Sequence, residues 1–135
     1  MKTSCGVLIT DGKQLLVCHV TLQPQWDIPK GVMDGLEDCK ATAIRECFEE
    51  TGVIIKPEYL QDLGMFEYLP TKKLHLFKVT IAPLPDVRKM KCTSTFERHG
   101  RAYPEVDNFM YCPYPDLERF TSVKLFPVLK RALNL

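Results

Sequence analysis

The sequence has no long apolar run, no excess of charge of one sign and no closely spaced cysteine pair. None of its 135 residues belongs to an apolar stretch as long as a transmembrane helix requires. Its first residues lack the long apolar region and the small-residue cleavage site of a secretory signal. The formal net charge is +1, which gives no electrostatic basis for bulk binding to nucleic acid or to an anionic membrane. We therefore expect a cytoplasmic protein without a membrane partner.

The six cysteines are scattered along the chain, and none forms a C-x-x-C pair. The three histidines have no zinc-ligand spacing with any of these cysteines, which argues against a zinc site. An even number of cysteines is compatible with disulfides. However, a chain of this length with 45% hydrophobic residues does not need covalent staples. The composition favours free thiols in a reducing compartment.

The chain is long enough for one domain with its own core, and we expect that domain to span residues 1–135. Alternation and turn signals predict several strands and two short helices near the end of the chain. Residues 73–81 are apolar on both faces, which predicts a central strand covered on both sides. The expected strands are residues 4–10 and 14–20 around the Asp11-Gly12 turn, 59–68, 73–81 and 105–111, and the expected late helices are 116–120 and 123–135.

Residues 38–51 contain no glycine or proline and are predicted to form one helix. Asp38 can cap its start, and Gly52 can end it in the left-handed conformation. Residues three and four apart share a helix face, so three glutamates are expected to form one carboxylate patch. The patch consists of Glu46, Glu49 and Glu50, and the apolar stripe expected opposite it consists of Ala41, Ile44, Cys47, Phe48 and Thr51.

Clustered carboxylates repel one another, and a bound cation would remove the conflict. Hard oxygen ligands favour Mg²⁺ or Mn²⁺ over zinc. Arg45 lies four residues before Glu49 and can brace that carboxylate. A solvated acidic helix face is the alternative interpretation.

A longer pattern surrounds these glutamates and resembles the Nudix box. That box has fixed glycine, glutamate, arginine-glutamate, paired glutamate and glycine positions, followed by an apolar residue. Together, such matches arise by chance on the order of once in 10⁹ windows. A preceding Trp-x-x-Pro-x-Gly segment, with Trp26 and Pro29, is similar to the one in Nudix enzymes. The matching box residues are Gly31, Glu37, Arg45, Glu46, Glu49, Glu50 and Gly52, followed by Val53.

The resemblance implies an α/β fold in which a mixed β-sheet lies between helices, the Nudix α/β/α sandwich. It also implies a metal site. Glu49 and Glu50 are the expected main ligands, with the backbone oxygen of Gly31 as a further ligand. For Glu46 two roles stay open, a third ligand or the base that deprotonates water.

Other roles follow from the same resemblance. Arg45 is expected to orient a box glutamate, and Gly52 is expected to be structural. Glu37 is expected to be structural, tying the loop to the helix, or to be an outer-shell metal contact. Many Nudix members add an acid from outside the box, and here Glu105 resembles it more closely than Glu97 does.

Two residues of the segment before the box are candidates for contact with substrate. Lys30 could reach a phosphate oxygen or lie in solvent, and Trp26 could stack on a base or pack in the core. The basic residues in the irregular segment 83–104 suit a lid over a polyphosphate site. A flexible solvated insertion and a short hairpin across residues 90–96 are the alternatives.

The activity implied is hydrolysis of a phosphoanhydride bond in a nucleoside diphosphate linked to another moiety, with Mg²⁺ or Mn²⁺. A dinucleoside polyphosphate or a nucleoside triphosphate is the preferred substrate. ADP-ribose, a nucleotide sugar, an RNA 5′ end, and a sensor domain that binds nucleotides without cleaving them stay open. Many relatives dimerise, so a homodimer also stays open.

Overall fold

The Asp11-Gly12 turn joins two strands in the predicted hairpin, and the computed structural model describes all of residues 1–135. Asp11 accepts hydrogen bonds from the backbone N–H groups of Lys13 and Gln14, which closes this turn. The strands are β1 (Lys2–Thr10), β2 (Gln14–Val20), β3 (Trp26–Asp27), β4 (Lys30–Val32), β5 (Gln61–Leu69), β6 (Lys72–Thr80), β7 (Thr95–Arg98), β8 (Arg101–Pro104) and β9 (Val106–Pro113). The α-helices are α1 (Cys39–Thr51), α2 (Leu117–Phe120) and α3 (Phe126–Ala132), and short 3-10 helices are η1 (Pro57–Tyr59), η2 (Val87–Lys89) and η3 (Tyr114–Asp116).

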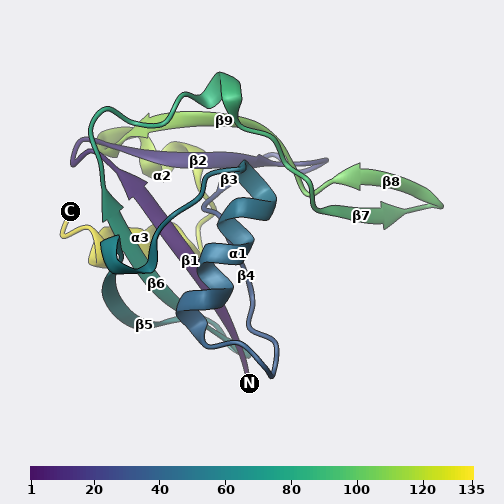
Figure 1. The fold of residues 1–135 in the computed structure, drawn as a ribbon, viewed down its shortest axis with the longest axis horizontal. Helices are drawn as coiled ribbons and strands as arrows, with labels where there is room; N and C mark the ends of the chain where they lie inside the picture. Colours follow the sequence, from purple (N-terminus) through teal and green to yellow (C-terminus); the bar gives the residue numbers. More distant parts are fainter.

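Seven strands form one mixed sheet. Its central order is β3-β2-β1-β6-β5, with β4 paired to β1 and β9 paired to β2. The β1–β6 pair is parallel, whereas β1 runs antiparallel to β2 and β4. Strands β7 and β8 form a separate two-stranded hairpin, which projects away from the rest of the molecule in Figure 1. No helix is both long and apolar enough to cross a membrane.

Helices cover both faces of the sheet, as Figure 1 shows. In β6, Leu74 and Leu76 join the core under α2 and α3, while Phe77 joins the core under α1. Strand β1 alternates in the same way, with Leu8 in the first core and Val7 in the second. This arrangement confirms the expected α/β/α sandwich and the central, doubly covered position of β6.

Helix α1 has the predicted caps. The Asp38 carboxylate accepts a hydrogen bond from the Ala41 N–H at 2.8 Å, and Gly52 ends the helix with φ of 80°. The predicted apolar stripe is partly wrong, because Ala41 and Phe48 are exposed. The buried positions of α1 are Thr42, Ala43, Cys47, Glu50 and Thr51. The helix is therefore rotated so that one of the glutamates faces inward.

Two other boundaries differ from the prediction. The hairpin of the irregular segment lies at residues 95–104 rather than 90–96. The last helix begins at Phe126 rather than at residue 123. Ser122 still caps the turn before it, since its Oγ accepts a hydrogen bond from the Leu125 N–H at 3.1 Å.

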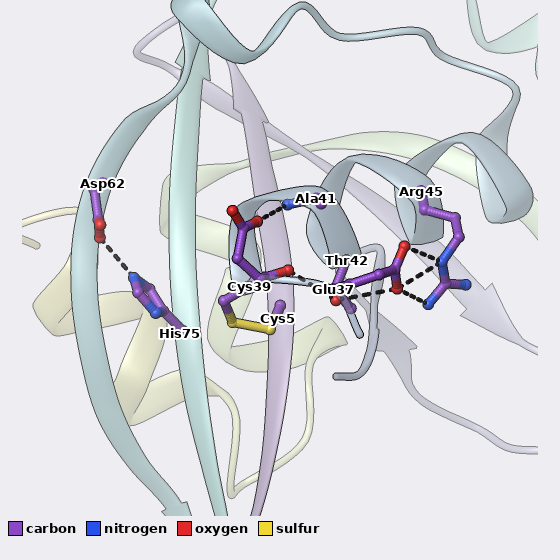
Figure 2. The surroundings of a disulfide bond; sticks show 9 residues. Cys5, Glu37, Cys39, Ala41, Thr42, Arg45, Asp62 and His75 are labelled. Atoms are coloured by element: carbon purple, nitrogen blue, oxygen red, sulfur yellow. Dashed lines mark hydrogen bonds and ion pairs between the residues drawn. A yellow bond between two sulfur atoms is a disulfide. The ribbon is translucent and has the colours of Figure 1, made fainter. Parts of the chain in front are cut away.

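The expectation that every cysteine is a free thiol is wrong. Cys5 on β1 and Cys39 at the start of α1 form a disulfide, with their Cα atoms 5.5 Å apart (Figure 2). Packing of α1 on β1 brings these residues together, and their separation of 34 residues in the sequence gave no sign of it. The free cysteines are Cys18, Cys47, Cys92 and Cys112.

Candidate active site

The three glutamates of the predicted patch lie in different environments along α1. Glu50 is only 4% exposed, while the side chains of Glu46 and Glu49 are 14% and 34% exposed. Burial raises the pKa of the Glu50 carboxyl to about 10, and the carboxylates of Glu46 and Glu105 add to this shift. Burial and the Glu49 carboxylate also raise the pKa of Glu46. The site therefore crowds carboxyl groups where water cannot fully screen their charges, which destabilises their ionised forms.

Gly31 is the point where β4 meets the glutamates. A side chain at this position would collide with Glu46, because an added Cβ would lie 2.0 Å from the Glu46 Cδ atom. Glycine thus lets the Glu46 carboxylate pack directly against the backbone of β4. This contact brings Gly31 and Glu46, separated in the sequence, into one site.

Arg45 links the acidic residues at the helix surface. Its Nη1 donates hydrogen bonds to Glu46 and to Glu49, each at 3.1 Å. Its Nε and Nη2 donate to Glu37 at 3.0 and 2.9 Å, a pairing that Figure 2 shows. The hydrogen bond to Glu37 raises the pKa of the Arg45 guanidinium above its ordinary value. Arg45 consequently fixes the box loop, through Glu37, to the helix that carries the glutamates.

Lys30 is held inside the site rather than extended into solvent. Its Nζ lies 2.8 Å from Oδ2 of Asp27 and 5.8 Å from the centre of the Tyr68 ring. Burial alone would lower the pKa of Lys30, but the Asp27 carboxylate outweighs it and raises the pKa. The ammonium group thus offsets part of the negative charge near Glu50.

The sequence did not predict Asp27 as a residue of the site. The i, i+3 spacing of Asp27 and Lys30, next to the tryptophan of the pre-box segment, is the signal that could have indicated it. Trp26 itself is half-buried and packs against the core on the α2 and α3 side. Its ring meets the His19 ring edge-on, with the ring centres 5.2 Å apart. This position favours packing over stacking on a substrate base.

The structure separates the two candidate acids from outside the box. Glu105, between β8 and β9, lines a cavity of about 190 Å³ together with Glu50, Lys30 and Asp27. Glu97 is exposed on β7 in the projecting hairpin. Glu105 is thus the acid that the fold brings beside Glu50.

The donor set suits a hard divalent cation, although no group of three acidic, histidine or cysteine side chains is already arranged as a metal cluster. The Glu46 carboxylate lies beside the Gly31 backbone, and burial together with repulsion from the Glu46 and Glu105 carboxylates raises the pKa of Glu50. A cation bound among these oxygens would remove that repulsion. Such oxygen donors are typical of Mg²⁺ and Mn²⁺ sites.

Comparison with known proteins identifies the family. The NUDIX domain family model matches residues 2–124. The chain belongs to the Nudix family. An uncharacterized 17.7 kDa protein from the e-segB intergenic region of Enterobacteria phage T4 is 36% identical over 143 residues, which span 96% of this Nudix chain and 94% of the phage protein.

Solved structures show the same Nudix fold at low sequence identity. The NUDIX domain of Shewanella oneidensis NrtR, complexed with ADP ribose, has a TM-score of 0.70 and 14% identity over 98% of this chain and 85% of its own. A C. elegans Ap4A hydrolase has a TM-score of 0.62 and 21% identity over 99% of this chain and 93% of its own. The α/β Nudix fold predicted from the box is therefore confirmed.

Proposed function

We propose that this Nudix chain, as one unit of residues 1–135, hydrolyses a phosphoanhydride bond in a nucleoside diphosphate linked to another moiety. The observation that carries the proposal is the cavity where Glu50, Glu105, Lys30 and Asp27 meet beside Glu46. Every acidic position of the box is filled. This favours an enzyme over a domain that only senses nucleotides.

In this proposal, Glu46, Glu49, Glu50 and the backbone oxygen of Gly31 would hold Mg²⁺ or Mn²⁺. When bound, the cation neutralises phosphate charge and lowers the pKa of a coordinated water. Arg45 keeps the carboxylates of Glu46 and Glu49 in place through its hydrogen bonds.

In this proposal, Glu105 is the general base and Lys30 balances the charge of the substrate phosphates. Glu105 accepts the proton of the attacking water, since it is exposed and lines the cavity. Glu46 is the alternative base. Lys30 balances negative phosphate oxygens at the buried end of the cavity, where Asp27 holds its ammonium group.

A dinucleoside polyphosphate or a nucleoside triphosphate is the preferred substrate in this proposal. One structural neighbour is an Ap4A hydrolase and another is complexed with ADP ribose, so ADP-ribose or a nucleotide sugar is the second candidate. The near-neutral net charge favours a small molecule over a long RNA, which leaves only an RNA 5′ end as a nucleic-acid substrate. We place the enzyme in the cytoplasm and allow for a homodimer.

The test is a product assay with a diadenosine polyphosphate, ADP-ribose, an oxidised dGTP and a 5′-triphosphate RNA, each with Mg²⁺ and with EDTA. We expect metal-dependent cleavage of one compound far above the others. Glu49→Gln should lower kcat/KM at least about 100-fold, a loss typical of a disturbed metal site. Glu58→Gln, on exposed η1, is the matched control and should leave activity unchanged.

Two results would contradict the proposal. Full activity of Glu49→Gln would show that the metal assignment is wrong. Tight nucleotide binding by the unmodified protein, without cleavage of any compound, would favour the sensor alternative.

A further inference from the structure

A second cavity opens beside the acidic one, at the base of the β7–β8 hairpin. Its volume is about 260 Å³, close to the lower end of the range for small-molecule sites. It shares the lining residues Val20 and Glu105 with the cavity that contains Glu50. A ligand with phosphates at the glutamates could therefore extend into it. The lining residues are Val20, Thr21, Gln23, Phe96, Arg98 and Glu105.

The hairpin supplies this cavity with an aromatic ring that is braced from its own second strand. Phe96 is the cross-strand partner of Tyr103, and their rings stack with centres 5.7 Å apart and planes 28° apart. The Arg101 guanidinium lies 5.7 Å from the Tyr103 ring centre. A ring held in this way can stack on a planar ligand with little loss of conformational freedom.

Thr21, which also lines this cavity, carries a polar atom that no protein group satisfies. Its residue is 6% exposed, and its Oγ1 is the only buried side-chain nitrogen or oxygen without a hydrogen-bond partner. The surrounding loop is fixed, because the Thr21 N–H donates to the Glu105 carbonyl at 3.2 Å. Buried hydroxyl groups without partners are rare in folded proteins, and a ligand in this cavity could supply the partner.

We propose that this cavity binds the nucleobase of the substrate, with purines preferred over pyrimidines. Phe96 stacks on the base, and a purine presents the larger ring face. The Gln23 amide and the Thr21 hydroxyl, each both donor and acceptor, bond to the base edge. This inference rests on the proposed function, since it names the part of the nucleotide substrate that lies outside the acidic cavity.

The direct test is calorimetric binding of AMP, GMP, CMP, UMP and ribose 5-phosphate to the unmodified protein in EDTA. None of these probes contains a phosphoanhydride bond, so the measurement does not depend on turnover. We expect the purine nucleotides to bind tightest and ribose 5-phosphate to bind about 10-fold more weakly, as the loss of one stacked base predicts. Equal affinity for AMP and ribose 5-phosphate would overturn the inference.

Substitutions at Phe96 and Thr21 test whether the base binds in this cavity. Phe96→Leu should weaken AMP binding about 10-fold, and Phe96→Trp should preserve it, because only the latter retains a stacking ring. Thr21→Val should weaken AMP binding about fivefold through the lost hydrogen bond, while Tm stays the same or rises. Tyr59→Leu, at an exposed residue of η1, is the control and should bind AMP normally. Unchanged AMP binding in both Phe96→Leu and Thr21→Val would refute the site.

The two proposals fail separately. If no panel compound is cleaved but AMP binding still depends on Phe96, the proposed hydrolase function is wrong and the base site stands. If cleavage is normal but AMP and ribose 5-phosphate bind equally well, the hydrolase function stands and the base site is wrong.

Discussion

The close contact between Gly31 and Glu46 predicts that adding one methyl group at residue 31 lowers activity but leaves the protein folded. In Gly31→Ala the new Cβ would lie 2.0 Å from the Glu46 Cδ atom, whereas such contacts almost never fall below 3.0 Å. The carboxylate must therefore move by about 1 Å or more, since the Gly31 backbone is held in the β1–β4 pairing. A misplacement of this size can lower a catalytic rate about 100-fold.

The same substitution should leave the protein folded. Glu46 is a flexible side chain, and moving it gives up one partly exposed ion pair with Arg45, worth about 0–1 kcal/mol. An unfavourable rotamer adds about 0.5–1.5 kcal/mol. The sum is a small part of the roughly 5–15 kcal/mol that stabilises a typical domain.

The assay is kcat/KM on the preferred substrate, with thermal unfolding of the same preparation. Gly35→Ala, in the loop that follows β4, is the matched control, because an added Cβ there would meet no atom within 4 Å. We expect Gly31→Ala to lose about 100-fold in kcat/KM and Gly35→Ala to lose almost nothing. Near-normal activity of Gly31→Ala would refute a catalytic role for the position of Glu46. Equal losses in both variants would assign the effect to the loop backbone instead.

Two further predictions concern the cysteines. Cys39→Ser should lower the free energy of unfolding by about 3–4 kcal/mol, because it opens the loop that the bond to Cys5 closes. Denaturant unfolding of the unmodified protein in dithiothreitol should show the same loss. Identical unfolding curves with and without reductant would show that the bond does not form. The second prediction concerns alkylation of the native, oxidised protein at pH 8, followed by mass spectrometry. The half-buried Cys92 should be modified first. Burial raises the pKa of the Cys47 thiol to about 12, so its reactive thiolate is scarce at pH 8. Rapid modification of Cys47 would contradict its burial.

Local signals explain the parts of the fold that the sequence predicted. The β1–β2 turn depends on Asp11, whose carboxylate bonds to backbone two and three residues ahead. The ends of α1 depend on Asp38 and Gly52, which act within four residues of themselves. Such features need no knowledge of the rest of the chain.

The rotation of α1 about its axis could not be obtained in this way. Apolar residues occur on more than one side of the helix, so counting them placed Phe48 inside and Glu50 outside. The structure reverses both, because Glu50 faces a cavity whose other walls come from β2, β3, β4 and the start of β9. The Cys5–Cys39 bond and the approach of Glu105 to Glu50 likewise depend on contacts between distant segments.

The disulfide also changes what a protease cut would do. Residues 5–39 form a covalently closed ring, and the exposed residues 33–36 lie within it. A single cut in that exposed stretch would leave the two pieces joined through sulfur. The nicked protein would migrate as one chain on a non-reducing gel and separate only when reduced. The bond therefore keeps the strand that carries Gly31 attached to the helix that carries the glutamates, even after the backbone between them is broken.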